Sequence, residues 1–265
     1  MTRLRAVLFD LHGTLVFATR HLTREAYARR FAERAEPLVR SRGVDLDLGA
    51  LCLELVSAVE TAWELASPRG RPVDCPFIVR GAFAHRGVEL TEEQARAFWN
   101  AGRLPLAEYA QLFPDTLDVL RELRAAGLRL ALVTNQPYPG ELLRPELEAH
   151  HLLEWFDALL VSHDVGCGKP HPAIFQRALD ALGAAPPEAL MVGDTPEIDI
   201  AGAKNLGIAA ALKRNGDRRR STGDADYVID DLVELLALPC MPRGVFRAEV
   251  APSPTPHEDD NEGRY

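Results

Sequence analysis

The chain has few cysteines, and they are not placed to form a recognisable metal or redox site. The four cysteines, Cys52, Cys75, Cys167 and Cys240, are scattered without a CxxC pair or the spacing of zinc ligands, so we expect free thiols in a reducing compartment. The sequence also lacks an apolar run of about 18 residues, the length that a membrane-spanning helix requires. No signal peptide precedes the first apolar segment. These absences predict a cytoplasmic protein.

Positive charge is also scarce. Lysines and arginines number 30 against 39 acidic residues, which gives a formal net charge of −9. This balance argues against a general nucleic-acid binder and provides no attraction to anionic membranes. A local cation or metal ion can still bring an anionic substrate to an acidic protein, so phosphate chemistry stays open. The length of 265 residues, with 47% hydrophobic and 26% charged residues, is ordinary for a globular protein of one large or two modest domains.

Short apolar runs alternate with helical patterns over much of the chain. The runs that predict strands are Ala6–Phe9, Leu128–Val133, Ala158–Val161, Ala189–Val192, Ile208–Ala211 and Tyr227–Ile229. Between them, amphipathic patterns predict helices over Thr116–Ala126 and Ala173–Leu182, each followed by a glycine that suits a helix C-terminus. Strands separated by helices favour an α/β fold with a parallel, doubly wound sheet.

A helical segment interrupts this pattern after the first strand. Helices are predicted at Arg24–Val39, Leu48–Leu65, Pro76–His85 and Glu92–Asn100. We expect residues 16–104 to form an all-helical domain, inserted into a discontinuous α/β core of residues 1–15 and 105–238. From residue 239 to residue 265, proline, serine and acidic residues predict a disordered tail.

Chemically reactive side chains recur where the predicted strands end. In chain order they are Asp10, His12 and Thr14, then Thr134 and Asn135, then Lys169, and finally Asp194 with Asp199. Open α/β sheets bind their ligands at the carboxyl ends of the strands, so these residues are candidates for one site. Each has an ordinary structural alternative, because aspartate is a common helix cap, Thr-Asn is common in turns, and lysine is usually a solvated surface residue.

Four segments carry a family resemblance. They read VLFDLHGTL, LVTNQ, GKPHPAIF and VGDTPEIDIAGAKNLG, in this order on this strand pattern. Together they resemble the haloacid dehalogenase superfamily, and specifically its Mg²⁺-dependent phosphohydrolases, over nearly all of Arg5–Leu238. The resemblance implies a Rossmann-like core with an inserted helical cap. It also implies that a strand-end aspartate is phosphorylated and that the aspartyl phosphate is then hydrolysed.

The resemblance assigns roles to the candidate residues. Asp10 corresponds to the nucleophile and a metal ligand, and Asp194 to the second carboxylate ligand. The residues that correspond to the phosphoryl-binding group are Thr134, Asn135 and Lys169. Asp199 would orient Lys169 or a metal-bound water. Electrostatics supports this pattern, because a carboxylate attacks a phosphoryl group only when the phosphate charge is neutralised, and Mg²⁺ prefers hard oxygen ligands.

His12 departs from the family pattern. The usual family phosphatase has an aspartate two residues after the nucleophile, which protonates the leaving group, later activates water, and binds the metal through its main-chain carbonyl. A side-chain change leaves that carbonyl in place, so we expect His12 still to contribute a metal ligand. Imidazole titrates near neutral pH, and we predict that His12 is the substitute acid/base. The alternative is a spectator. Neighbouring carboxylates would raise the pKa of His12 and Mg²⁺ would lower it, so the sequence leaves the sign of the shift open.

Two other functions are compatible with parts of the pattern. Metal-independent 2-haloacid dehalogenases of the superfamily also lack the second aspartate, but they generally lose the acidic pattern that Gly193 and Asp194 keep here. A binding protein that retains the fold is the other alternative, and intact Asp10 and Lys169 argue against it. We therefore predict a Mg²⁺-dependent hydrolase of a small phosphorylated metabolite, with no nucleic-acid or membrane partner. The natural substrate and the oligomeric state stay open.

Three further groups of residues have both a structural and a functional interpretation. His171 stands where the family commonly has aspartate, and we interpret it as a helix-start residue rather than a ligand. Trp63 and Trp99 are interpreted as core of the helical domain rather than a stacking platform. Arginines of the helical segment are interpreted mainly as solvated surface, although they are placed to attract an anionic substrate: Arg20, Arg24, Arg69, Arg71, Arg80 and Arg86.

Overall fold

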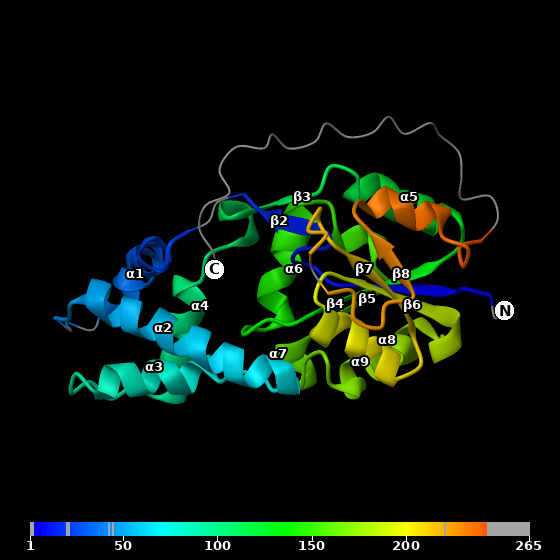
Figure 1. The fold of residues 1–265 in the computed structure, drawn as a ribbon. Coiled ribbons are helices and arrows are strands. Elements are labelled where there is room, and N and C mark those ends of the chain that lie inside the picture. The colour runs from blue at the N-terminus through cyan, green and yellow to red at the C-terminus, as the bar shows by residue number, and fades with distance from the viewer. Residues whose placement is uncertain (1–2, 20–21, 42, 44, 220, 243–265) are drawn as a thin grey trace.

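The computed structural model describes residues 3–19, 22–41, 43, 45–219 and 221–242 of the chain. Within this part, the centre is a parallel sheet of six strands in the order β5-β4-β1-β6-β7-β8 (Figure 1). The strands are β1 Ala6–Phe9, β4 Arg129–Thr134, β5 Ala158–Val161, β6 Ala189–Gly193, β7 Ala209–Lys213 and β8 Tyr227–Ile229. The parallel α/β sheet predicted from the sequence is confirmed.

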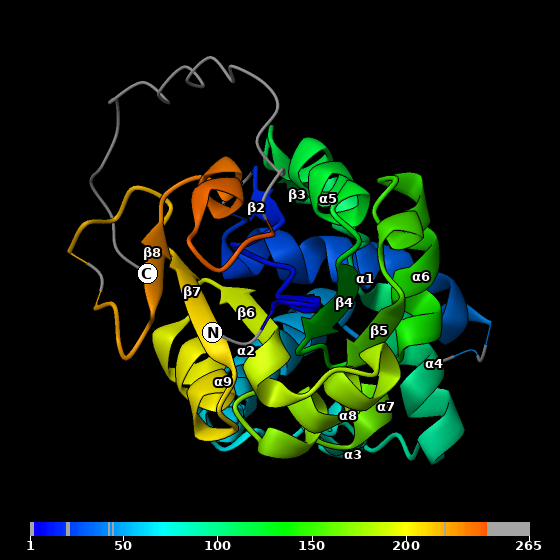
Figure 2. The same cartoon turned by 90° about the vertical axis from the view of Figure 1, so that its right-hand side faces the viewer.

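The central strands are apolar along their length because helices cover both faces of the sheet. On β1, Val7 and Phe9 pack into one hydrophobic cluster, while Ala6 and Leu8 pack into another on the opposite face. The helices of the first face are α5 Thr116–Ala125 and α6 Gly140–Ala149, and those of the second are α8 Pro172–Leu182 and α9 Ala201–Asn205. Figure 2 shows the sheet between these two helical layers. The sheet is therefore doubly wound.

The strand register places Asp10 at the centre of one edge of the sheet. Phe9, the last residue of β1, pairs with Leu132 of β4 and with Val192 of β6. Because all three strands run in parallel, their carboxyl ends meet at the same edge. The residues that follow these strands therefore lie next to Asp10.

The helices of the predicted insert share a hydrophobic cluster of their own. They are α1 Arg24–Arg40, α2 Leu48–Ala66, α3 Cys75–Ala84 and α4 Glu92–Gly102. The N-cap side chain of each accepts a hydrogen bond from the first turn: Thr23, Asp47, Asp74 and Thr91. Phe31, Leu55, Phe83 and Phe98 belong to the shared cluster, which is separate from both clusters of the sheet. Figure 1 shows these helices packed together to one side of the sheet.

A short antiparallel pair of strands was missed by the sequence prediction. β2 (Val16–Ala18) pairs with β3 (Ala110–Leu112), which joins the segments entering and leaving the helices. The expectation that residues 16–104 are all-helical is therefore wrong at its first residues. Strands of three residues are too short to show an alternating pattern. The division of the chain into two domains stays a prediction.

The remaining elements are short or were not predicted. The helix α6 and the single-turn helix α7 (Ser162–Val165) had no predicted counterpart. Short helical turns occur at Ser67–Arg69, Leu106–Glu108, Leu153–Trp155, Pro186–Glu188, Pro196–Ile200 and Leu232–Ala237. Most of the predicted tail, residues 243–265, lies outside the described residues. None of the helices in the described part of the chain combines the length and the apolar character needed to cross a bilayer.

Candidate active site

A cavity of about 670 Å³ opens at the carboxyl ends of β1, β4 and β6, and residues of α1, α2 and α4 form its other walls. Its lining includes every residue to which the family resemblance assigned a role: Asp10, His12, Thr134, Asn135, Lys169, Asp194 and Asp199. Thr14, which was also a candidate, is fully buried and does not line the cavity. Pockets of this size commonly hold small-molecule ligands. The structure thus brings these residues together, whereas the roles assigned to them stay predictions.

The ammonium group of Lys169 lies between two carboxylates. Its Nζ atom is 2.5 Å from Oδ1 of Asp10 and 2.7 Å from Oδ1 of Asp199. The lysine is 1% exposed, so water screens these ion pairs only weakly. Burial lowers the pKa of Lys169, but the two carboxylates outweigh burial and raise its pKa above the usual value. Lys169 is therefore a fixed positive charge beside Asp10.

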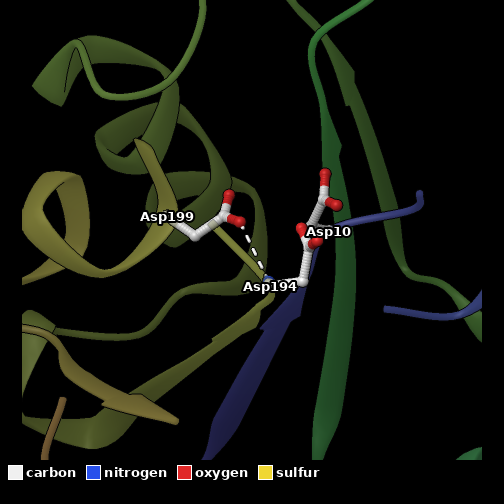
Figure 3. Close-up of side chains that lie close together, drawn as sticks. All are labelled: Asp10, Asp194 and Asp199. Atoms are coloured by element: carbon white, nitrogen blue, oxygen red, sulfur yellow. Dashed lines mark hydrogen bonds between the residues drawn. The ribbon is translucent and has the colours of Figure 1, made fainter. Parts of the chain in front are cut away.

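Asp10 is buried at the end of β1 in an acidic cluster. Burial raises the pKa of Asp10, Lys169 opposes this, and the charge of Asp194 raises the pKa further, so that the net shift is upward. Oxygen atoms of Asp10, Asp194 and Asp199 lie within 4.8 Å of one another (Figure 3). The cluster holds three carboxylates, and the ammonium of Lys169 pairs with Asp10 and Asp199, so the acids outnumber this lysine and favour a further cation.

Asp199 is held by two hydrogen bonds to one of its oxygen atoms and by an ion pair at the other. Oδ2 accepts hydrogen bonds from the main-chain N–H groups of Asp194 at 3.1 Å and Thr195 at 3.0 Å. Oδ1 pairs with Lys169. Figure 3 shows the bond from the Asp194 main chain. Asp199 thus positions both the lysine and the loop that carries Asp194.

The residues present fit a divalent cation held by Asp10 and Asp194. Gly13 packs so closely against Asp194 that a β-carbon at Gly13 would lie 2.3 Å from Oδ2 of this carboxylate. Its φ of +74° also favours glycine. The main chain directly after His12 therefore lies against the carboxylate of Asp194. Carboxylates and main-chain carbonyls are the hard oxygen donors that Mg²⁺ accepts, together with water and phosphate.

His12 is an uncharged imidazole in the wall of the cavity. Its Nδ1 atom lies 3.4 Å from Nε2 of Gln136, and its Nε2 atom lies 3.0 Å from the hydroxyl of Tyr109. Because the amide of Gln136 donates, Nδ1 is the acceptor and Nε2–H donates to Tyr109. Burial, followed by the charge of Lys169, lowers the pKa of His12 to about 4, and Glu146 opposes the shift only weakly. The sequence had left the sign of this shift open.

Asn135 holds the main chain of Lys169. Its Nδ2 atom donates to the carbonyl of Lys169, and its Oδ1 atom accepts from the N–H of Lys169, both at 2.8 Å. Thr134, at the end of β4, is 1% exposed, and its hydroxyl accepts a hydrogen bond from Gln136. Asn135 therefore supports the buried lysine, and its predicted part in phosphate binding stays a prediction.

Sequence reasoning missed two residues that support the first loop. The Nδ2 atom of Asn215 donates to the carbonyl of Gly13 at 2.8 Å. The ammonium of Lys213, at the end of β7, contacts Oδ1 of Asn215 and lies 3.2 Å from the ring centroid of Phe113. Burial lowers the pKa of Lys213 to about 8. An Asn-Gly pair is a usual turn signal, so nothing in the sequence links Asn215 to a loop some 200 residues earlier.

The predictions for His171, for the two tryptophans and for the arginines of the helical segment have different outcomes. His171 is the N-cap of α8, and its Nδ1 atom accepts a hydrogen bond from the N–H of Ala173. Trp99 is buried in the cluster of α1 to α4, yet both Trp63 and Trp99 also line the cavity. Among the predicted arginines, Arg24 lines the cavity and Arg86 pairs with Glu54. Arg20 lies outside the described residues.

Comparisons with known proteins place this geometry in a family. The family model of haloacid dehalogenase-like hydrolases matches residues 4–207. The chain is 36% identical over 189 residues to a phosphoserine phosphatase of Thermus thermophilus, covering 68% of this chain and 73% of that protein. It is 31% identical over 243 residues to a glyceraldehyde 3-phosphate phosphatase of Methanopyrus kandleri, covering 88% and 96% of the two chains.

The fold is also shared with a dehalogenase. A 2-haloacid dehalogenase structure from Pseudomonas syringae superposes with a TM-score of 0.60 and 22% identity, covering 88% of this chain and 97% of that one. An identity this low supports a common fold and says nothing about a common reaction. The family model spans most of the chain, including β1, β4, β6 and the residues of the acidic cluster. The chain therefore belongs to the haloacid dehalogenase-like hydrolases.

Proposed function

We propose that the protein is a Mg²⁺-dependent phosphomonoester hydrolase that works through an aspartyl phosphate on Asp10. The observation that carries the proposal is the buried ammonium of Lys169, which is fixed 2.5 Å from Oδ1 of Asp10 within the acidic cluster. A nucleophilic carboxylate and a phosphate are both anions, so their approach requires positive charge at that place. Phosphatases among the relatives support the same choice.

The proposed reaction has two steps. An oxygen of Asp10 attacks phosphorus and the bond to the leaving oxygen breaks, which gives the aspartyl phosphate and an alkoxide that takes a proton from solvent. Water then loses a proton to a base and attacks phosphorus, and the bond from phosphorus to Asp10 breaks. This step restores the carboxylate of Asp10 and releases inorganic phosphate. Throughout, Lys169 and the Thr134 hydroxyl stabilise negative charge on the phosphoryl oxygens.

A bound Mg²⁺, held by Asp10, Asp194 and the main-chain carbonyl of His12, would neutralise phosphate charge in both steps. Asp199 and Asn135 keep Lys169 in position through its side chain and its main chain, respectively. The chain's own residues thus supply the nucleophile, the cation and the positioning.

We assign His12 the role of base in the second step. Its imidazole is uncharged at neutral pH, because burial lowers the pKa to about 4. The Nδ1 atom carries no proton, and it can accept one from the attacking water once its 3.4 Å contact with Gln136 is broken. Because this pKa leaves almost no imidazolium at neutral pH, His12 has no proton to donate in the first step. The leaving group therefore departs largely as the alkoxide.

Phosphate release with and without Mg²⁺ tests the proposal. We expect release from 4-nitrophenyl phosphate and acetyl phosphate that depends on the metal and stops on addition of a chelator. Halide release from a 2-haloacid in the presence of a chelator would instead indicate a dehalogenase. If neither phosphate nor halide is released, the protein is a binding protein and the proposal is contradicted.

A steep dependence on the leaving group is expected for the wild-type enzyme. A general acid contributes about 10²–10⁴-fold to rate. Its absence in the first step lowers the rate most for substrates with poor leaving groups. Across a series of substituted phenyl phosphates, kcat/KM should fall by roughly that factor from 4-nitrophenyl phosphate to unsubstituted phenyl phosphate. The shared ring keeps pocket contacts nearly constant. A flat series would show that a strong acid is present.

His12→Ala separates the base role from a spectator. We expect kcat for 4-nitrophenyl phosphate to fall about 10²-fold, with a burst of nitrophenol because the first step is intact. The control is His163→Ala, which removes an imidazole that is absent from the cavity lining. Unchanged kcat and no burst in His12→Ala would make His12 a spectator.

Asn215→Ala is expected to weaken Mg²⁺ binding. The substitution removes the hydrogen bond to the carbonyl of Gly13, which packs against Asp194. Loss of such supporting contacts typically costs about 10–100-fold in metal affinity or activity. Titration calorimetry with Mg²⁺ measures the effect, and Asn205→Ala at the exposed end of α9 is the control. Equal affinities in both variants would exclude a supporting role for Asn215.

A further inference from the structure

The outer part of the cavity differs in chemistry from its acidic end. Beyond the carboxyl ends of the strands, its lining is dominated by apolar and aromatic side chains. They include Tyr27 of α1, Val56, Val59 and Trp63 of α2, Trp99 of α4 and Leu104. Trp63 and Val59 are only partly buried, so they are accessible from the cavity. This apolar wall has no part in the chemistry at Asp10.

The described cations of the cavity wall are already paired with acids of this chain. Arg24 pairs with Glu60 at 2.6 Å, and both side chains are about half exposed, at 53% and 44%. Arg103 pairs with Glu146 at 2.5 Å and also lies over the ring of Tyr138.

Lys169 pairs with the acidic cluster. Within the described residues, each cation of the cavity wall therefore faces an acid of this chain, and a second anionic group of a substrate would compete with that acid. The exposed Glu64 adds negative charge to the wall formed by α2. A carboxylate or a second phosphate on the substrate would meet apolar side chains and these acids.

We propose that the substrate is a phosphomonoester whose alcohol carries a large, uncharged apolar or aromatic group. This inference rests on the proposed function, since the phosphoryl group must lie at Asp10. The apolar group then extends along the wall formed by Val59 and Trp63. A cavity of about 670 Å³ is far larger than a phosphoryl group needs, and burial of an apolar group there favours binding.

Two alkyl phosphates with equally poor leaving groups test the inference. We expect kcat/KM with Mg²⁺ to be about 100-fold higher for 2-(2-naphthyl)ethyl phosphate than for ethyl phosphate, because the ring system buries apolar area. Both release a primary alcohol, so the need for protonation is the same. Glycerol phosphate and phosphoserine are the polar comparisons, and we expect both to resemble ethyl phosphate.

Trp63→Ala locates the contact. The ratio of kcat/KM between the naphthyl and ethyl substrates should fall about tenfold in this variant. The control is Leu65→Ala on the same helix, because Leu65 is 64% exposed and does not line the cavity. This control should leave the ratio unchanged.

Binding of phosphonates separates this inference from the proposed function. We expect 2-(2-naphthyl)ethyl phosphonate to bind more tightly than ethyl phosphonate in calorimetry, even if no substrate is turned over. Metal-dependent release of phosphate from acetyl phosphate, combined with no preference for the naphthyl compounds, would overturn the inference and leave the proposed function standing. Tight naphthyl binding without release of phosphate from any substrate would overturn the proposed function instead. If the protein turns over no substrate and shows no preference for the naphthyl compounds, both the inference and the proposed function are overturned.

Discussion

Asp10→Asn is expected to abolish phosphate release, with a loss in kcat of about 10⁴-fold or more. An amide is nearly isosteric with a carboxylate but is a far weaker nucleophile, so the aspartyl phosphate cannot form. The substitution also removes one of the two charges that face Lys169. The measurement is phosphate release from 4-nitrophenyl phosphate and from acetyl phosphate with saturating Mg²⁺.

The control for this substitution is Asp118→Asn. Asp118 is 74% exposed on α5 and pairs with Arg121 one turn along the same helix. A change of the same chemistry at that position should leave kcat and KM as in the wild type. If Asp10→Asn released phosphate at the wild-type rate, the nucleophile would have to be another group.

Lys169→Met is expected to lower kcat/KM by roughly 10³-fold. Methionine has a similar length but no charge, so the phosphoryl oxygens lose the fixed cation beside Asp10. Because the lysine acts on the charge of the transition state, the loss should appear in kcat more than in KM. Steady-state kinetics with 4-nitrophenyl phosphate measures this split. A loss confined to KM would mean that Lys169 only helps to bind the substrate.

The same substitution is expected to destabilise the protein by about 3–5 kcal/mol at neutral pH, because it leaves two buried carboxylates without their partner. Burial already raises the pKa of both Asp10 and Asp199 in the folded protein. Without the lysine, these pKa values rise further above the unfolded values. The folded variant then binds more protons than its unfolded chain, so its stability falls as pH rises through that window.

Urea denaturation at pH 5 and pH 7 in a chelator measures this dependence. The stability difference between the wild type and Lys169→Met should shrink at the lower pH. The control is Lys204→Met, since Lys204 pairs with Asp226 at a site where both side chains are about one-third exposed. Exposed pairs contribute about 0–1 kcal/mol. An equal loss of unfolding free energy in the two variants would contradict the buried pairing of Lys169 with Asp10 and Asp199.

Much of the sheet was predictable because each buried strand is a short apolar run with helices on either side. β1, β5 and β8 were predicted with the bounds they have. The pair β2 and β3 was not, because its pairing depends on segments about 90 residues apart. Helix α6 was missed, and it contains Pro145, which sequence rules count against a helix interior.

The site was predictable as far as it depends on strand ends. Asp10 and Asp194 follow buried strands, and the parallel register brings them together. The state of His12 was not predictable, because its pKa depends on burial and on the charges of Lys169 and Glu146, which come from other parts of the chain. The support of Gly13 by Asn215 is likewise a tertiary contact. Sequence spacing indicates which groups meet, whereas their protonation depends on how completely water is excluded.

A crystal structure with Mg²⁺ and beryllium fluoride, a mimic of the phosphoryl group, tests the central claim most directly. The account predicts beryllium bound to a carboxylate oxygen of Asp10, its fluorine atoms within reach of Lys169 and Thr134, and the metal ion between Asp10 and Asp194. Density for neither ion beside these acids, at concentrations that saturate other enzymes of the family, would contradict it.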